Sequence, residues 1–180
     1  KQKKFIIYDN YWDFRLSNII KKKYKSVDLI YSANTLTHIS NQNDVFKSIC
    51  NLLSNNGILI IEDPSLLECI KKNSYDQFYN EHIYLFSAIS VNNLLNKFNL
   101  EIFDLKNMST HGGSLRYYIK RKTNKSLKVS NNVKKQIVKE TKFGIHKFDT
   151  YMKFSKNVQK SKKNLLKILN KIKKKKKKII

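Results

Sequence analysis

Two short strand-like runs with a helical segment between them constrain the fold of this chain most strongly. Residues 27–33 read as a strand, and residues 58–61 form a continuous apolar run. Such runs are typical of parallel strands buried on both faces. Between them, Asp44 is the expected N-cap of a helix, and the Asn55-Asn56-Gly57 triplet is expected to end it. Alternation of strand and helix predicts an α/β fold with a parallel, Rossmann-like sheet.

Similar patterns predict the remaining elements. Three lysines end the helix expected at 12–23, as helix C-termini favour. Ser90 is the expected cap of a later helix, and the lysine-rich chain beyond Ser130 has helical spacing. The other expected elements are a strand at 5–8, a helix at 65–73, and strands at 100–106 and 115–122, joined across the His111-Gly112-Gly113 turn.

The expected sheet also predicts where ligands bind. In open α/β sheets, ligands collect at the carboxyl ends of parallel strands. Three such ends carry polar groups here: Asp9-Asn10, Ser32-Ala33-Asn34 and Glu62-Asp63-Pro64.

The net charge of +24 raises the hypothesis of nucleic-acid binding, but the distribution of charge argues against it. Residues 1–120 include 15 basic and 11 acidic residues, whereas residues 121–180 include 22 basic and two acidic residues. Nearly all the basic residues are lysine, whereas arginine is the residue favoured for bidentate recognition of bases and phosphates. We therefore expect no specific nucleic-acid partner.

Other sequence features limit which class of protein this chain can belong to. No apolar run reaches the roughly 20 residues of a membrane span, so we expect no membrane partner. Cys50 and Cys69 are too few for a disulfide framework or a metal cluster, and a reducing cytoplasm is the expected compartment. The chain lacks an initiator methionine, which favours an internal fragment.

Tyr79-Asn80-Glu81-His82 sets a histidine beside a carboxylate and a phenol. Histidine titrates near neutrality and suits general acid–base catalysis when a neighbour orients it. In a loop these three groups can converge, whereas on a regular strand or helix they would diverge. The alternative is a structural histidine whose ring is bonded to the backbone.

His111-Gly112-Gly113-Ser114 predicts a turn whose exposed amides could hold a carboxylate or phosphate, with Arg116 adding a bidentate contact. The alternative is a simple hairpin turn. His38 follows a strand end where a ligand could reach it, although a capping or packing histidine has the same pattern. His146, among lysines, reads as a surface residue.

Taken together, these segments resemble the sugar C-methyltransferases, class I S-adenosylmethionine-dependent enzymes that methylate C3 of nucleotide-linked 4-keto-deoxysugars. The resemblance covers about residues 5–169. It is carried by Val27-Asp28-Leu29-Ile30 with Asn34 and His38, by 56–62, by 79–82 with Phe86-Ser87, and by 111–116. The last two segments are specific for this family, particularly because they occur in this order and at this separation.

The resemblance implies roles for individual residues. His82 would be the base that removes the proton next to the ketone, with Glu81 and Tyr79 assisting. S-adenosylmethionine would lie against Asn34, Asn10, Tyr11 and Ala33. The nucleotide-sugar substrate would be bordered by His111, Ser114, Arg116 and His38.

The resemblance also implies a division of the chain. Residues 1–122 would be the C-terminal part of the S-adenosylmethionine domain, and 123–180 the helical start of a truncated substrate-side domain. The family's zinc-binding unit, first strand and glycine-rich loop have no counterpart, so zinc is expected only in a missing N-terminal unit. Two alternatives stay open: a lysine-rich module that binds nucleic acid or an anionic surface, and a catalytically dead remnant.

Overall fold

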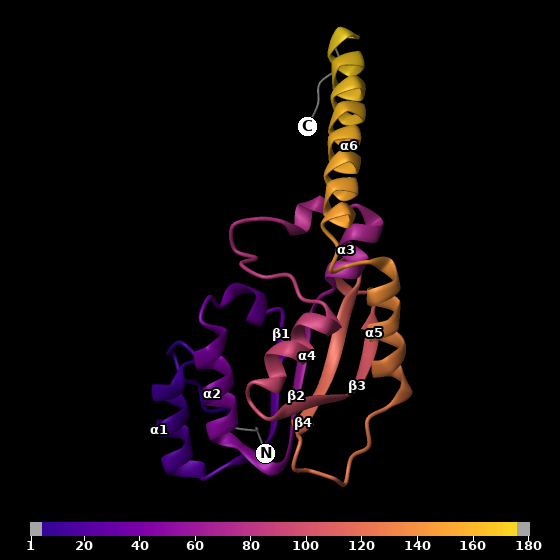
Figure 1. The fold of residues 1–180 in the computed structure, drawn as a ribbon. Helices are drawn as coiled ribbons and strands as arrows, with labels where there is room; N and C mark the ends of the chain where they lie inside the picture. Colours follow the sequence, from indigo (N-terminus) through magenta and orange to yellow (C-terminus); the bar gives the residue numbers. More distant parts are fainter. Residues whose placement is uncertain (1–4, 176–180) are drawn as a thin grey trace.

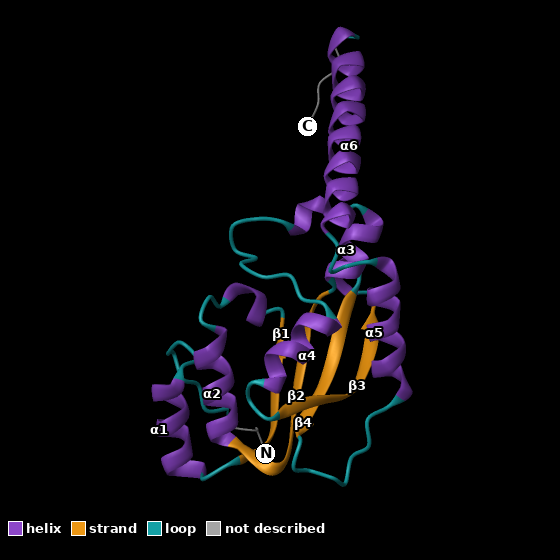
Figure 2. Cartoon of the chain, in the orientation of Figure 1, coloured by secondary structure: helices purple, strands orange, loops and turns teal. Residues whose placement is uncertain are grey.

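A four-stranded mixed sheet forms the centre of the computed structural model, which describes residues 5–175 (Figure 2). The strand order is β1-β2-β4-β3, comprising β1 (Val27–Ala33), β2 (Leu53–Pro64), β4 (Ser114–Arg121) and β3 (Leu100–Met108). β1 and β2 are parallel, but β4 is antiparallel to both β2 and β3. The parallel pairing expected from the alternation of strand and helix is found between β1 and β2. A short turn joins β3 to β4, and a parallel pair would need a long crossover instead.

Helices pack on one face of this sheet (Figure 1). α2 and α4 lie against the sheet, α1 lies beside α2, and α5 runs along β3. The long α6 extends away from the rest of the molecule. The helices are α1 (Phe14–Tyr24), α2 (Gln42–Leu52), α3 (Leu66–Lys72), α4 (Ala88–Asn96), α5 (Asn131–Phe143) and α6 (Phe148–Lys174), with 3-10 turns η1 (Leu36–His38), η2 (Tyr75–Gln77) and η3 (Thr110–Gly112).

Two expected helix caps lie three residues too late. Asn41 caps α2 and accepts a hydrogen bond from the Asp44 amide at 3.1 Å. Ser87 caps α4 and forms a capping box with Ser90. In both helices the expected residue occupies the third helical position, whose amide the true cap accepts.

The strand expected at residues 5–8 is irregular chain instead. Phe5 and Ile7 are 86% and 85% exposed. A strand is stable only when a neighbour accepts and donates its backbone hydrogen bonds, and no described strand pairs with this segment.

The main core lies between the sheet and the helices on its covered face. Side chains alternate along a strand, so Leu59 and Ile61 point into this core, while Leu29 and Tyr31 point to the other face and are 59% and 57% exposed. Burying one such core side chain contributes about 1.5–3 kcal/mol. The fully buried members include Val45, Phe46, Leu59, Ile61, Leu95, Leu100, Ile102, Leu115, Tyr117 and Ile119.

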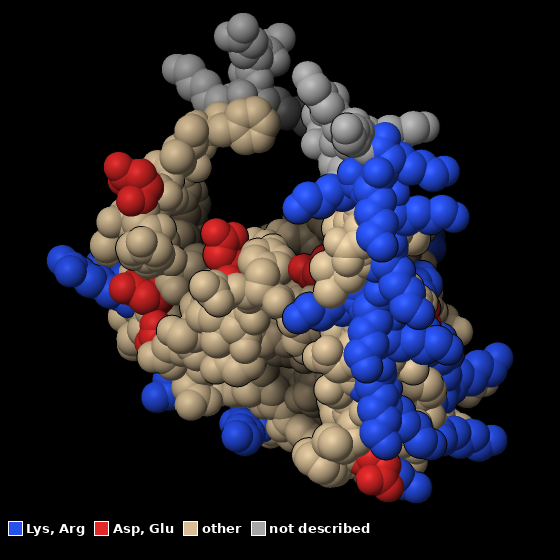
Figure 3. Space-filling view, turned by 90° about the horizontal axis from the view of Figure 1, so that it is seen from above, with Lys and Arg blue, Asp and Glu red and all other residues tan. Residues whose placement is uncertain are grey.

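α6 has an apolar and a basic side. Near its start, Phe154 packs against Phe78 with ring centroids 5.4 Å apart, and Tyr151 donates a hydrogen bond to the Ile145 carbonyl. Figure 3 shows lysines gathered along the part of the molecule where α5 and α6 lie.

No described helix is long and apolar enough to span a membrane. Within the domain expected at 123–180, residues 176–180 lie outside the described residues.

Candidate functional site

His82 lies in a loop that brings its expected partner onto the imidazole ring. Its Nδ1 is 2.8 Å from the Gln77 carbonyl oxygen, and its Nε2 is 3.0 Å from the Tyr79 hydroxyl. The Tyr79 and His82 rings are 4.2 Å apart between centroids. This segment has no regular secondary structure, and its backbone places the Gln77 carbonyl and the Tyr79 hydroxyl at the two nitrogens of one ring.

His38 lies against the same ring from a distant part of the chain. The centroids of the His38 and His82 rings are 4.9 Å apart, and His38 Nδ1 lies 2.8 Å from the Glu81 carbonyl oxygen. Glu81 therefore contributes its backbone to the cluster, and its side chain is exposed. The histidine cluster, His38 with Tyr79 and His82, is the first candidate site.

The hydrogen bonds determine where each imidazole carries its proton. A carbonyl oxygen can only accept, so Nδ1 of His38 and of His82 must each carry a hydrogen. In a neutral ring the opposite nitrogen, Nε2, then has a free lone pair. On His82 this lone pair accepts from the Tyr79 hydroxyl, and on His38 Nε2 has no hydrogen-bond partner among residues 5–175. The free Nε2 is thus that of His38, whereas Tyr79 occupies Nε2 of His82. An open depression of about 430 Å³, lined by His38, Asn80, Glu81 and Ile83, lies beside His38.

The His111-Gly112-Gly113 turn has a backbone that depends on its glycines. His111, Gly112 and Gly113 have φ values of 51°, 76° and 134°. A Cβ on Gly113 would lie 2.9 Å from the Glu68 Cβ, whereas around Gly112 the nearest atom is the Ser74 hydroxyl at 3.8 Å. The turn therefore packs tightly on α3 at Gly113.

We expect Gly113→Ala to destabilise the chain by about 1–3 kcal/mol. The reason is that alanine would combine an unfavourable φ with a clash against α3. Gly112→Ala is the matched control: it carries the φ penalty without the clash, and should cost about 1 kcal/mol. Urea unfolding of both variants measures the difference, and equal losses would show that contact with α3 does not matter.

Arg116 is engaged by Glu62 across the sheet. Arg116 Nε and NH2 lie 2.7 and 2.6 Å from Glu62 Oε2, and Thr110 donates to Glu62 Oε1 at 3.1 Å. Glu62 is buried. Ser114 is also buried, and its hydroxyl donates to the Thr110 carbonyl. These contacts hold the turn in place, while the exposed His111 is the member of this motif that faces solvent.

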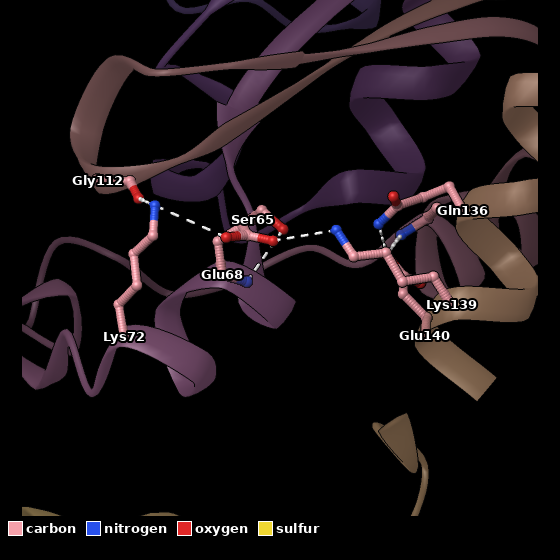
Figure 4. Close-up of polar contacts among 8 residues, drawn as sticks. Ser65, Glu68, Lys72, Gly112, Gln136, Lys139 and Glu140 are labelled. Atoms are coloured by element: carbon pink, nitrogen blue, oxygen red, sulfur yellow. Dashed lines mark hydrogen bonds and ion pairs between the residues drawn. The ribbon is translucent and has the colours of Figure 1, made fainter. Parts of the chain in front are cut away.

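Both motifs meet the start of α3. The Ser65 amide donates to the Gly113 carbonyl at 3.0 Å, and the Leu66 amide donates to the Phe86 carbonyl at 2.9 Å. Figure 4 shows Lys72 reaching the Gly112 carbonyl, and Glu68 bridging Lys72 and Lys139 of α5. No hydrogen bond or ion pair directly joins the histidine cluster to Arg116 within the described chain.

The residues expected near S-adenosylmethionine separate into two sets. Ala33 lines a cavity of about 310 Å³ whose apolar wall includes Trp12, Ile30 and Leu36, with Ser32 and Thr35 as polar members. Such an aromatic and aliphatic wall fits the adenine side of the cofactor. Asn10, Tyr11 and Asn34 lie outside this lining and are exposed. No group of three or more possible metal ligands occurs among the described residues.

A buried polar cluster next to His38 combines Asp63, from a strand end that was expected to carry ligand-binding groups, with Thr37 and Tyr117, which the sequence did not point to. Asp63, Thr37 and Tyr117 are each no more than 1% exposed. The Asp63 carboxylate, the Thr37 hydroxyl and the Tyr117 hydroxyl have no hydrogen-bond partner among the described residues. Burial raises the pKa of Asp63 to about 7, and Glu62 acts in the same direction. Asp63 follows the continuous apolar run 58–61 after Glu62, and this position is what marked the strand end in the sequence.

Comparison with known proteins finds two family models and a curated relative. Residues 109–180 match the C-methyltransferase C-terminal domain, and residues 4–105 match the methyltransferase domain. The C-methyltransferase NovU of Streptomyces niveus is 31% identical over 87 residues, which are 48% of this chain and 21% of that relative. The matched part thus spans about a fifth of the relative's length.

Two solved structures share lower similarity. The magnesium protoporphyrin IX methyltransferase ChlM of Synechocystis, with bound SAH, is 16% identical, with a TM-score of 0.41 over 53% of this chain and 45% of its own. A SAM-dependent methyltransferase of Anabaena variabilis is 12% identical, with a TM-score of 0.45 over 62% of this chain and 56% of its own.

The expected α/β class is confirmed by the mixed sheet and its helices. The expected enzyme class and S-adenosylmethionine as cofactor agree with the family models. The domain boundary at residue 122 stays a prediction. Because the methyltransferase domain model matches more than half of the 180 residues, and a C-methyltransferase C-terminal domain follows it, this chain belongs to the methyltransferase family.

Proposed function

We propose that this chain is part of a C-methyltransferase that deprotonates and then methylates a carbon next to the ketone of a nucleotide-linked 4-keto-deoxysugar. The observation that carries the proposal is the histidine cluster, in which both imidazoles carry their hydrogen on Nδ1 and one of them, His38, lines an open depression. The NovU match supports carbon as the methylated atom. The nucleotide-sugar substrate rests on the sequence resemblance.

His82 is the proposed base. The Gln77 carbonyl fixes its Nδ1–H, so Nε2 can take the proton from the substrate carbon, and the electron pair left behind is delocalised onto the keto oxygen. Tyr79 donates to Nε2 and orients the ring, so Nε2 becomes free to take the proton when the substrate displaces the Tyr79 hydroxyl. Ala33 and the apolar wall beside it would hold the adenine side of S-adenosylmethionine, which when bound supplies the methyl group.

Replacing His82 with alanine in the full-length protein is expected to lower methyl transfer by about 10²–10⁴-fold, the usual contribution of a general base. The assay follows transfer of labelled methyl from S-adenosylmethionine to a nucleoside-diphosphate 4-keto-deoxysugar. Tyr79→Phe should cause a smaller loss, because the ring stays anchored to Gln77. His146→Ala, an exposed histidine, is the matched control. Wild-type rates in the His82 variant would show that another residue is the base.

Binding of nucleic acid or an anionic surface remains the alternative prediction. On α6 the lysines 153, 156, 160, 163, 167, 171 and 174 recur every three or four residues, the spacing of one helical face. Apolar residues such as Phe154, Val158 and Leu165 occupy the other side, as on an ordinary amphipathic helix with a solvated basic side. The alternative therefore gains no specific support. The reading as a catalytically dead remnant is tested by the same methyl-transfer assay.

A further inference from the structure

Asp63 is a buried carboxyl group that the proposed chemistry does not use. It lies near the end of β2 and pairs with Leu115 of β4, and it is 1% exposed. Neither carboxylate oxygen has a hydrogen-bond partner in the described part of the chain. Buried polar groups are normally hydrogen-bonded, and one left without a partner lowers stability. A carboxyl group in this state calls for an explanation.

The groups that face Asp63 belong mainly to the turn that carries His38. The backbone amides of Thr37 and Thr35 and the Thr37 hydroxyl lie close enough to favour the carboxylate, against the burial that disfavours it. Thr37 is completely buried, and its hydroxyl is also without a partner among the described residues. A small movement of this turn would therefore satisfy both groups at once.

The same turn holds the loop that carries His82. The next residue, His38, donates to the Glu81 carbonyl at 2.8 Å. The Tyr84 amide donates to the Thr37 carbonyl at 3.2 Å. Contacts therefore run from Asp63 through residues 35–38 to residues 81–84.

We propose that Asp63 is a positioning residue, which sets the turn at residues 35–38 and thereby holds His38 against His82 for the reaction. The link to catalysis rests on the proposed function, whereas the structural link between Asp63 and the histidines does not. No hydrogen bond joins Asp63 to either histidine among the described residues, so its effect passes through Thr35 and Thr37.

The charges around Asp63 fit a positioning role better than a stabilising one. Glu62 on the same strand is a carboxylate, and burial raises the pKa of Tyr117 on β4, with Glu140 of α5 and Asp63 acting in the same direction. Burial places Asp63 among acidic groups rather than beside a cation. A buried residue that lowers stability, as Asp63 does, is expected at positions where function requires it.

The test compares Asp63→Asn with Thr37→Val and with Asp28→Asn as matched control. The asparagine keeps the shape of the Asp63 side chain and removes its charge. The Asp28 variant makes the same chemical change on the same sheet, but at an exposed position. In the 180-residue chain, NMR would follow the imidazole signals of His38 and His82 and the contacts between the two rings. Urea unfolding would follow stability, and methyl transfer would be measured in the full-length protein.

We expect Asp63→Asn to fold with raised stability at about pH 8, to shift the signals of both histidines, and to lower kcat about 100-fold with little change in KM, as for a misplacement of about 1 Å. Thr37→Val should shift the same signals, and Asp28→Asn should not. A merely structural residue would instead lose stability when replaced, without a selective loss of kcat.

Each other outcome is decisive. Unchanged histidine signals in a folded Asp63→Asn chain would overturn the proposal, and so would an Asp63→Asn chain that fails to fold. Shifted histidine signals together with no methyl transfer by the wild-type protein would refute the proposed function and leave the structural link intact.

Discussion

Replacing Glu140 with alanine is expected to destabilise the folded chain by about 2–5 kcal/mol, because two backbone amides lose their acceptor at about 1–3 kcal/mol each. Glu140 is completely buried on α5. Its Oε1 and Oε2 accept from the amides of Ala88 and Ile89 at 2.9 and 3.0 Å, and Oε1 also accepts from Gln136 at 2.9 Å. The carboxylate thus binds the first amides of α4, from 52 residues away.

The physical reason is that the buried amide of Ala88 and the partly buried amide of Ile89 would lose their acceptor. Each unsatisfied buried group costs about 1–3 kcal/mol, and the negative charge that favours a helix N-terminus would be lost as well. Alanine is the best helix former, so helix propensity in α5 cannot account for a loss.

Urea unfolding followed by circular dichroism measures this effect. Glu140→Gln is the matched control, because its carbonyl oxygen can still accept from one amide, and it should lose clearly less. A loss below about 1 kcal/mol for alanine, the size of an ordinary substitution, would mean that water or a rearranged α4 replaces the carboxylate.

Asp63→Asn is expected to stabilise the chain above pH 7 by up to about 4 kcal/mol, the equivalent of a rise of about three pKa units at 1.36 kcal/mol each. The pKa of Asp63 is raised from 3.8 to about 7, chiefly by burial. Between these values the folded chain holds a proton that the unfolded chain has released. The contribution of Asp63 to stability is therefore lost as the pH rises from about 4 to 7, and stays lost above it.

The measurement is the difference in unfolding free energy between variant and wild type across about pH 4–8. This difference should be small near pH 4, grow up to about pH 7 and then level off. Using the difference removes the contributions of other titrating groups, which both chains share. A difference that does not change with pH would show that Asp63 titrates as an ordinary exposed carboxyl does.

Local sequence patterns were sufficient for most elements but not for their caps. The strand at 27–33 was predicted with the bounds that β1 has, and the turn between β3 and β4 was placed correctly. Asp44 and Ser90 were wrong as caps, because Asn41 and Ser87, three residues earlier, are equally good cap residues. Propensity alone does not decide between two such residues, whereas the packing of the helices on the sheet, through Val45 in α2 and Val91 in α4, does.

The sequence also identified the histidine cluster in part. Tyr79 and His82 could be paired because they are three residues apart in a loop. The approach of His38 to within 4.9 Å of His82 could not be derived from spacing, since 43 residues separate His38 from Glu81, which holds its ring. Arg116 was expected to face a substrate, but the structure pairs it with Glu62.

What the sequence determined by itself was local: which segments form strands and helices, and which turn needs glycine. These depend on backbone preferences and on hydrophobic spacing within a few residues. The tertiary structure decided the pairing of β4 with β2, the position of Glu140 at the first amides of α4, and the burial of Asp63 next to the turn that carries His38. These features depend on which distant segments share a surface, because a charge becomes a buried cap or a carboxyl with a raised pKa only when other parts of the chain exclude water from it.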